Sequence, residues 1–369
     1  MSSRMSCAGL LHRAFAALVL VGAGFHADAQ SIQLALPIAC EPGRTCYIQN
    51  YTDLDPSRSA RDYKCGTLTY DEHNGTDFRL PSLAVQKAGV EVRAAAGGSI
   101  LRIRNDAPDG TFTKLGREAV REAECGNGVV IEHPEQWETQ YCHLAAGSVL
   151  VKLGDKVELG QPIGRVGLSG LTEYPHLHFT VRHNGVVVDP FAYGVRPESC
   201  QGGQSLWLTA LRSKLEYQER AILNAGFTTG PVTMELIEDG SAERQMPSAS
   251  SMAIVAFVRA IGLKAGDAQW LVIKDPLENV IAETRSAPLQ ANKAQFMLFA
   301  GKKRPPGGWN AGPTRPLMLS SAMARSCSGK TWSSCSSAAP VLGGPDSTGL
   351  LRSDRLPELA RSRYRARRG

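Results

Sequence analysis

Residues 175–179 read PHLHF, and this stretch has the pattern of a β-strand that carries two histidines on one face. Side chains of a strand alternate between its two faces, so His176 and His178 point to the same side. Leu177 and Phe179 point to the other side, toward a core. The strand rise places the two histidine Cα atoms about 6.5 Å apart. This spacing suits one imidazole on a metal and one beside a metal-bound water. A solvated polar strand face is the alternative, and H-x-H alone does not decide between them.

The sequence around PHLHF consists of short apolar runs separated by glycine, from Cys65 to about Tyr193. Runs of this length, with no long helical period between them, predict an antiparallel β domain. Asn184-Gly185 lies between two such runs and predicts a tight hairpin. The runs are residues 98–104, 128–133, 139–144, 147–153, 162–167, 176–181 and 186–189.

The chain continues with a second globular stretch from residue 203 to 312, and its 369 residues are enough for two or three compact units. A helix-like segment at 208–223 is followed by alternating apolar runs at 253–258 and 269–274. This pattern predicts a smaller β-rich accessory domain, for which a sandwich is one suitable arrangement.

Residues 313–369 are rich in Ser, Pro, Gly and Arg and end in RSRYRARRG. They hold too little apolar surface to offset the entropy of ordering them, so a disordered basic tail is expected. This tail alone carries a net charge of +7, against +6 for the whole chain. The folded body is therefore near neutral, and no nucleic-acid surface is expected on it. The change of composition is abrupt. An altered reading frame is one hypothesis for it, and resequencing the gene would test that hypothesis.

Residues 1–29 have the pattern of a secretory signal peptide. Arg4 and Arg13 precede the apolar run AFAALVLVGAG at 14–24, and Ala27-Asp28-Ala29 fits a small-residue cleavage site. The run is too short for a membrane anchor, and no later segment approaches about 18 apolar residues. We expect an exported chain, periplasmic or extracellular, without a transmembrane anchor. Residues 30–62 then form a polar lead-in to the β domain.

Disulfides are expected because an exported chain meets an oxidising compartment. Removal of the signal peptide would take Cys7 from the nine cysteines and leave an even number. None of them forms a C-x-x-C pair, which argues against a zinc–thiolate site. The favoured pairs are Cys40 with Cys46, and Cys125 with Cys142 across a hairpin.

A second candidate ligand pair lies upstream, in DEHNGTD at 71–77. His73 and Asp77 are four positions apart, so they share a side whether the backbone is extended or helical. Together with one histidine from elsewhere they would make a zinc site with three protein ligands and one position open for water, which is the catalytic type.

His143 is a further candidate, in the run TQYCHL at 139–144. Strict alternation predicts that Thr139, Tyr141 and His143 share one face of a strand. A single histidine on a strand is more often a solvated or hydrogen-bonded residue. His133 and His183 each lie at a predicted turn and are interpreted in that way.

These motifs resemble, in their order, the lysostaphin/LytM-type zinc endopeptidases of peptidase family M23. The motifs are HxGxD at 73–77, GVVIEHPEQWETQYCHL at 128–144, HLHF at 176–179 and VDP at 188–190. The resemblance covers about residues 63–195. It implies a β-type peptidase domain at 63–198 that cuts peptide bonds in the stems or cross-bridges of bacterial peptidoglycan.

The resemblance also implies roles for individual residues. It implies one Zn²⁺ per chain, held by His73, Asp77 and His178. It implies catalytic roles for His143 and His176, since an imidazole beside the metal can take a proton from water or donate to a developing oxyanion. The sequence leaves open which histidine does which.

Two departures from the family pattern flank the strand. Glu173-Tyr174 stands before PHLHF where many relatives have small residues, and Thr180 follows Phe179 in place of a frequent acidic residue. Both concern the expected substrate groove and neither changes a ligand.

Two other functions compete with a zinc endopeptidase. One is a non-catalytic relative that activates a separate wall amidase, although such proteins usually lack some ligands. The other is a secreted binding module in which the metal is only structural.

Overall fold

The computed structural model describes residues 31–275, 279–309, 321–328 and 340–341, the last two ranges through their backbone. The predicted signal peptide lies outside the described residues. In the part of the chain that is described, no helix is long and apolar enough to cross a membrane. The fold is mainly antiparallel β, as the short glycine-punctuated runs predict.

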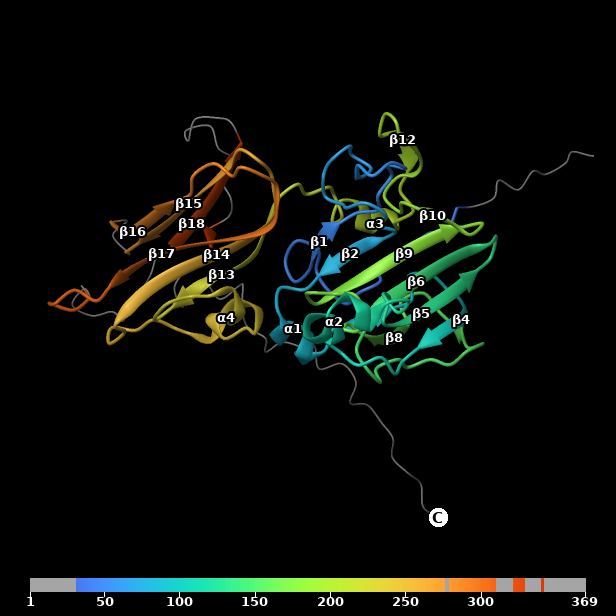
Figure 1. The fold of residues 1–369 in the computed structure, drawn as a ribbon, viewed down its shortest axis with the longest axis horizontal. Coiled ribbons are helices and arrows are strands. Elements are labelled where there is room, and N and C mark those ends of the chain that lie inside the picture. Colours follow the sequence, from blue (N-terminus) through green and yellow to red (C-terminus); the bar gives the residue numbers. More distant parts are fainter. Residues whose placement is uncertain (1–30, 276–278, 310–320, 329–339, 342–369) are drawn as a thin grey trace, which may run out of the picture. The chain divides into compact units, whose positions relative to one another are not determined.

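An eight-stranded antiparallel sheet carries the candidate site (Figure 1). Its strand order is β1-β2-β9-β6-β5-β4-β7, and β10 pairs with the C-terminal part of β9. These strands are β1 (Tyr47–Asn50), β2 (Thr76–Arg79), β4 (Gly98–Arg104), β5 (Asn127–His133), β6 (Trp137–Leu144), β7 (Lys156–Val157), β9 (His176–His183) and β10 (Val186–Val188).

Short elements complete this part of the chain. Two small sheets pair β3 (Glu91–Arg93) with β8 (Pro162–Arg165) and β11 (Tyr193–Arg196) with β12 (Gln201–Gln204). The helical segments are α1 (Leu83–Ala88), α2 (Thr111–Leu115) and η1 (Arg117–Val120).

The alternation predicted for PHLHF is confirmed in β9. Leu177 and Phe179 are completely buried in the main apolar core. Trp207 packs in the same core, with its ring 5.9 Å from that of Phe179. The predicted hairpin is also confirmed, because Asn184 and Gly185 both have positive φ between the paired strands β9 and β10. The core therefore fixes the direction in which His176 and His178 point.

One prediction about this region is wrong. Residues 147–153 form no strand, since Leu150 and Leu153 are 65% and 71% exposed and the segment reaches β8 through one backbone hydrogen bond, from Leu150 N to Ile163 O. The predicted lead-in at 30–62 contains β1, which pairs with β2 inside the main sheet, and the domain boundary at residue 63 stays a prediction.

Three disulfides are present among the described residues. Cys40–Cys46 and Cys125–Cys142 are the two predicted pairs. The third, Cys65–Cys200, joins residues 135 positions apart. This pair could not be deduced from spacing, because only the tertiary fold brings its two ends together.

Two further sheets follow from residue 221 onward. One has the order β13-β14-β17 and the other β16-β15-β18-β19. Ile254 and Val258 of the first sheet and Leu271 and Ile273 of the second belong to one buried apolar cluster. The elements are α3 (Thr209–Arg212), β13 (Ala221–Thr228), α4 (Met234–Glu238), η2 (Ala242–Arg244), β14 (Ala253–Leu263), β15 (Asp267–Lys274), β16 (Val280–Arg285), β17 (Lys293–Lys303), β18 (Ser321–Ser328) and β19 (Pro340–Val341). The separate accessory domain at 203–312 stays a prediction.

Two predictions for this region are corrected. The helix expected at 208–223 is limited to α3, since the chain has entered β13 by Ala221. The tail expected to be disordered at 313–369 contains β18, which pairs with β15 along its whole length. Except for β18 and β19, the rest of that tail from residue 313 lies outside the described residues.

Candidate metal centre

Three predicted ligands converge on one point of the main sheet. Asp77 and His178 are cross-strand neighbours of β2 and β9, and His73 comes from the loop that leads into β2. Asp77 Oδ1 lies 2.9 Å from His178 Nδ1 and 3.2 Å from His73 Nε2. The two nitrogens are also 3.2 Å apart. One nitrogen, one oxygen and a second nitrogen therefore face a common centre, with all three atoms within 4.8 Å of one another.

Gly75 allows the loop of His73 to approach β9 this closely. A Cβ atom at this position would lie 2.6 Å from the Phe179 carbonyl oxygen and 2.8 Å from His178 Nε2. Contacts below 3 Å with a backbone atom cannot be accommodated without moving the loop or the strand. The glycine of HxGxD is therefore required by the packing of the two ligand-bearing segments.

Hydrogen bonds on the outer side of each imidazole fix which nitrogen is free. His73 Nδ1 donates to the Tyr51 carbonyl oxygen at 2.7 Å, which leaves a lone pair on Nε2. His178 Nε2 donates to Asn74 Oδ1 at 2.9 Å, which leaves a lone pair on Nδ1. Both free nitrogens are the ones that face Asp77. Outer partners of this kind orient the imidazoles of metal sites.

Asp77 supplies the negative charge of the site. Burial alone would raise the pKa of its carboxyl, but the positive charge that His73 and His176 carry when protonated, with the contacts that His178 and His73 make to the carboxylate, holds the pKa well below its usual value. Its second oxygen, Oδ2, accepts a hydrogen bond from Asn50 Nδ2 at 2.9 Å. Burial lowers the pKa of His73, but the protonated ring gains the Asp77 charge and a hydrogen bond to Asp77, and these outweigh burial, so the pKa is raised. The donor set of two imidazoles and one carboxylate fits a divalent metal of the zinc type.

His143 and His176 lie beside this cluster. Their ring centroids are 4.6 Å apart, and the ring of His143 is 6.0 Å from that of His178. His176 Nε2 lies 3.4 Å from Asp77 Oδ1. The structure thus brings the predicted catalytic histidines to the predicted ligands.

The alternation argument for His143 is wrong, although the residue reaches the site. Thr139 and Tyr141 are completely buried on the core side, and strict alternation would place His143 with them. Instead, the register of β5 and β6 shifts by one residue between Asn127 and Val129, and His143 adopts a left-handed φ of 63°. This β-bulge turns the imidazole to the face that carries His176.

Both of these histidines also present a free Nε2. His143 Nδ1 donates to the Ser169 carbonyl oxygen at 2.8 Å, and His176 Nδ1 donates to the Tyr174 carbonyl oxygen at 3.0 Å. Burial and neighbouring imidazoles lower the pKa of His143 strongly. Burial also lowers the pKa of His176. Neutral imidazoles with an unused lone pair can accept a proton, which is what a general base must do.

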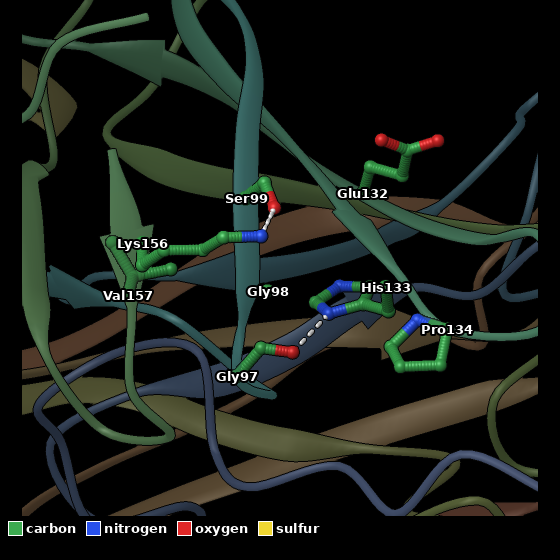
Figure 2. Close-up of a pocket in the computed structure, with 8 residues that line it drawn as sticks. All are labelled: Gly97, Gly98, Ser99, Glu132, His133, Pro134, Lys156 and Val157. Carbon is green, nitrogen blue, oxygen red and sulfur yellow. Dashed lines mark hydrogen bonds between the residues drawn. The ribbon is translucent and has the colours of Figure 1, made fainter. Parts of the chain in front are cut away.

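His133 and His183 do not join the site, as predicted. His133 Nδ1 donates to the Gly97 carbonyl oxygen, and its Nε2 accepts from Thr139 Oγ1, each at 2.8 Å. It lines a separate cavity of about 410 Å³, and Figure 2 shows its ring directed at Gly97. His183 bonds the Tyr193 hydroxyl and stacks on Trp137.

Several residues that contact the site were not predicted from the sequence. Asn50 and Tyr51 come from the predicted lead-in, more than twenty positions before His73, and nothing local marks them. Asn74 lies inside the HxGxD motif, and its position between His73 and Gly75 could have indicated a hydrogen-bond partner for a ligand histidine. A cleft of about 430 Å³ opens beside His73 and Asn74, and its lining includes neither Asp77 nor His178.

Known proteins resemble the part of the chain that builds this site. Residues 71–190 match the sequence model described as peptidase family M23. A peptidoglycan DD-endopeptidase, ShyA of Vibrio cholerae, is 36% identical over 107 residues, which are 29% of this chain and 19% of that protein. The DD-carboxypeptidase/endopeptidase Mpg of Neisseria meningitidis is 33% identical over 138 residues, which are 37% of this chain and 26% of that protein. The match thus spans about a fifth to a quarter of the length of these curated relatives.

The cell division protein DipM of Caulobacter vibrioides is 30% identical over 114 residues, 31% of this chain and 17% of that protein. Among solved structures, the catalytic domain of lysostaphin from Staphylococcus simulans is 26% identical and covers 33% of this chain and 77% of that chain, with a TM-score of 0.24. The family match begins two residues before His73 and ends just after Asp189, so it includes every residue predicted to bind metal or act in catalysis. The predicted resemblance to peptidase family M23 is therefore confirmed for residues 71–190 of this chain.

Proposed function

We propose that the protein is an exported zinc-dependent endopeptidase that hydrolyses peptide bonds of bacterial peptidoglycan. One observation carries this proposal: the free lone pairs of His73, His178 and Asp77 share a centre, and two further neutral imidazoles stand beside it. A purely structural metal site would not require these extra imidazoles. A fourth protein ligand would be typical of such a site.

His73, Asp77 and His178 would hold the metal. Zinc bound there supplies a Lewis acid that acidifies water and polarises a peptide carbonyl at neutral pH. The carboxylate balances part of the added positive charge, and the Tyr51 and Asn74 oxygens keep the two imidazoles in the correct tautomer.

His143 and His176 would move the proton. Each has Nδ1 tied to a backbone carbonyl, so only Nε2 is available to the reacting groups. Nε2 can accept the proton of the attacking water and later return it to the leaving amine. An imidazolium formed in this way also stabilises negative charge on the carbonyl oxygen.

Peptidoglycan is the proposed substrate because two of the relatives carry peptidoglycan or DD-endopeptidase activity in their names. Export is supported by the signal-like segment at 1–29 and by the three disulfides. The non-catalytic activator is less favoured, because such proteins usually lack some of the metal ligands, whereas His73, Asp77 and His178 are all present in this chain.

Incubation of the mature protein with purified peptidoglycan, followed by mass analysis of the released fragments, tests the proposal. We expect fragments that reveal a cleaved peptide bond, their loss after chelation, and their return when zinc is added. His178→Ala should abolish both zinc binding and release, whereas His183→Gln, a change in the same strand outside the site, should retain both. Hydrolysis that is unaffected by chelation would overturn the proposal. Full zinc occupancy without any hydrolysis would favour the binding or activating functions.

A further inference from the structure

Tyr174 borders the candidate site and directly precedes PHLHF. Its ring lies 4.8 Å from the ring of His176, and the Arg79 guanidinium stacks on it at 4.2 Å. Arg79 is itself buried, with 1% of its surface exposed. The tyrosine side chain is thus held between two fixed neighbours, while part of its own surface stays exposed.

The hydroxyl of Tyr174 reaches Asn50, the residue that also contacts Asp77. Asn50 Nδ2 lies 2.9 Å from Asp77 Oδ2 and 3.3 Å from the Tyr174 hydroxyl oxygen. One amide nitrogen therefore bridges the carboxylate of the metal centre and the tyrosine.

The direction of both hydrogen bonds follows from the carboxylate. An ionised carboxylate can only accept, so Asn50 must present its NH₂ group and not its carbonyl oxygen to Asp77. The same NH₂ group faces Tyr174, so the tyrosine oxygen accepts a hydrogen bond there. The phenolic proton is consequently not used on Asn50. Within the described residues, no other hydrogen-bond partner of this hydroxyl is found.

We propose that the Tyr174 hydroxyl donates a hydrogen bond to the carbonyl oxygen of the bound peptide as negative charge develops on that oxygen. A polar hydrogen in a mostly enclosed position needs an acceptor, and the substrate would supply it. A donor fixed in advance by Arg79 and Asn50 loses little freedom when the charge appears. This inference rests on the proposed function, because it assumes that a peptide carbonyl binds at this centre.

Tyr174→Phe tests the inference, since it removes only the hydroxyl and keeps the ring between Arg79 and His176. The matched control is Tyr193→Phe, because the Tyr193 hydroxyl bonds His183 outside the site. The zinc-loaded wild type and both variants are compared in three measurements. These are hydrolysis of purified peptidoglycan, zinc affinity by chelator competition, and calorimetric binding of a peptide phosphinate, whose tetrahedral oxygens resemble the reacting carbonyl.

For Tyr174→Phe we expect kcat to fall about 10- to 100-fold with little change in KM, and phosphinate binding to weaken by a similar factor. Zinc affinity and the thermal midpoint should match those of the wild type and of Tyr193→Phe. Unchanged kcat and phosphinate binding would overturn the inference. Reduced zinc affinity with normal kcat at saturating zinc would also overturn it, because Tyr174 would then act only through Asn50 and Asp77. An inactive wild type that still binds zinc would instead contradict the proposed function. In that case, the difference in phosphinate affinity between the wild type and Tyr174→Phe would still test the role of the Tyr174 hydroxyl.

Discussion

The imidazole rings of His143 and His176 lie 4.6 Å apart, although His143 stands near the end of β6 and His176 begins β9. Each ring uses Nδ1 to donate to a backbone carbonyl, from Ser169 in one case and Tyr174 in the other. The two free Nε2 atoms are therefore presented by backbone acceptors, and not by carboxylates. Neutral imidazoles oriented in this way can exchange protons without a large change in the charge of the site.

Replacement of either histidine should separate catalysis from metal binding. His143→Ala and His176→Ala leave His73, Asp77 and His178 intact, so zinc content should equal that of the wild type. Hydrolysis of peptidoglycan should fall about 10²- to 10⁴-fold, the usual contribution of a positioned acid or base. His183→Gln serves as the control histidine and should retain activity. Equal activity of His143→Ala and the wild type would favour a binding module over an enzyme.

Gly75→Ala should disrupt the metal centre through backbone contact alone. The added Cβ would meet the Phe179 carbonyl oxygen and His178 Nε2 at 2.6 and 2.8 Å, so the loop of His73 must move away from β9. We expect the zinc content measured by elemental analysis to drop to a small fraction of that of the wild type. Gly230→Ala is the matched change, because no atom lies within 4 Å of its added Cβ. Normal zinc binding by Gly75→Ala would show that the loop has more freedom than this packing implies.

The Cys125–Cys142 disulfide should support both stability and the position of His143. His143 directly follows Cys142, and its backbone N–H donates to the Cys125 carbonyl oxygen at 2.8 Å. Replacing both cysteines by serine should lower the free energy of unfolding by about 3 kcal/mol, the usual effect for a loop of this length. The same variant should lose kcat because the bulge that orients His143 is released.

The Cys40→Ser/Cys46→Ser variant provides the control for the disulfide, since this pair closes a six-residue separation away from His143. It should lower stability without a change in kcat. Chemical denaturation and hydrolysis assays on both variants give the two readouts. The positional role of Cys125–Cys142 would be excluded if its loss changed stability alone.

Asp189 should make stability depend on pH. Burial raises the pKa of its carboxyl to about 7, with a smaller effect from Asp62 in the same direction, while backbone N–H groups of Phe191 and Ala192 act against this. Its Oδ2 atom is buried without a hydrogen-bond partner among the described residues. A raised acid pKa means that the folded state holds the proton longer than the unfolded state. The stabilisation is therefore complete below about pH 4 and is lost as the pH rises through about 7.

Asp189→Asn removes this titration and keeps an oxygen for the Phe191 N–H. The free energy of unfolding of the wild type, measured relative to Asp189→Asn, should fall by up to about 4 kcal/mol between pH 4 and pH 8. Urea denaturation at several pH values measures the difference, and other titrating groups cancel in the comparison. If the difference in the free energy of unfolding between the wild type and Asp189→Asn stayed constant from pH 4 to pH 8, the raised pKa of Asp189 would be contradicted.

The sequence by itself determined those parts of the fold and site that depend on local chain geometry. Period-two alternation in PHLHF placed Leu177 and Phe179 in the core and both histidines on the opposite face. The spacing of HxGxD placed His73 and Asp77 on one side, and Asn184-Gly185 specified the hairpin by its preference for positive φ. These features need only neighbouring residues, so a pattern in the sequence is sufficient to predict them.

The tertiary structure decided what depends on pairing between distant segments. His143 changed faces because β6 carries one more residue than β5 between their matched positions, and alternation cannot reveal such a bulge. Asn50 and Tyr51 reached the site because β1 joins β2 at the edge of the main sheet. The unused proton of Tyr174 followed only from the direction of the Asn50–Asp77 hydrogen bond. Register and hydrogen-bond direction are set by the assembled sheet, and no local propensity specifies them.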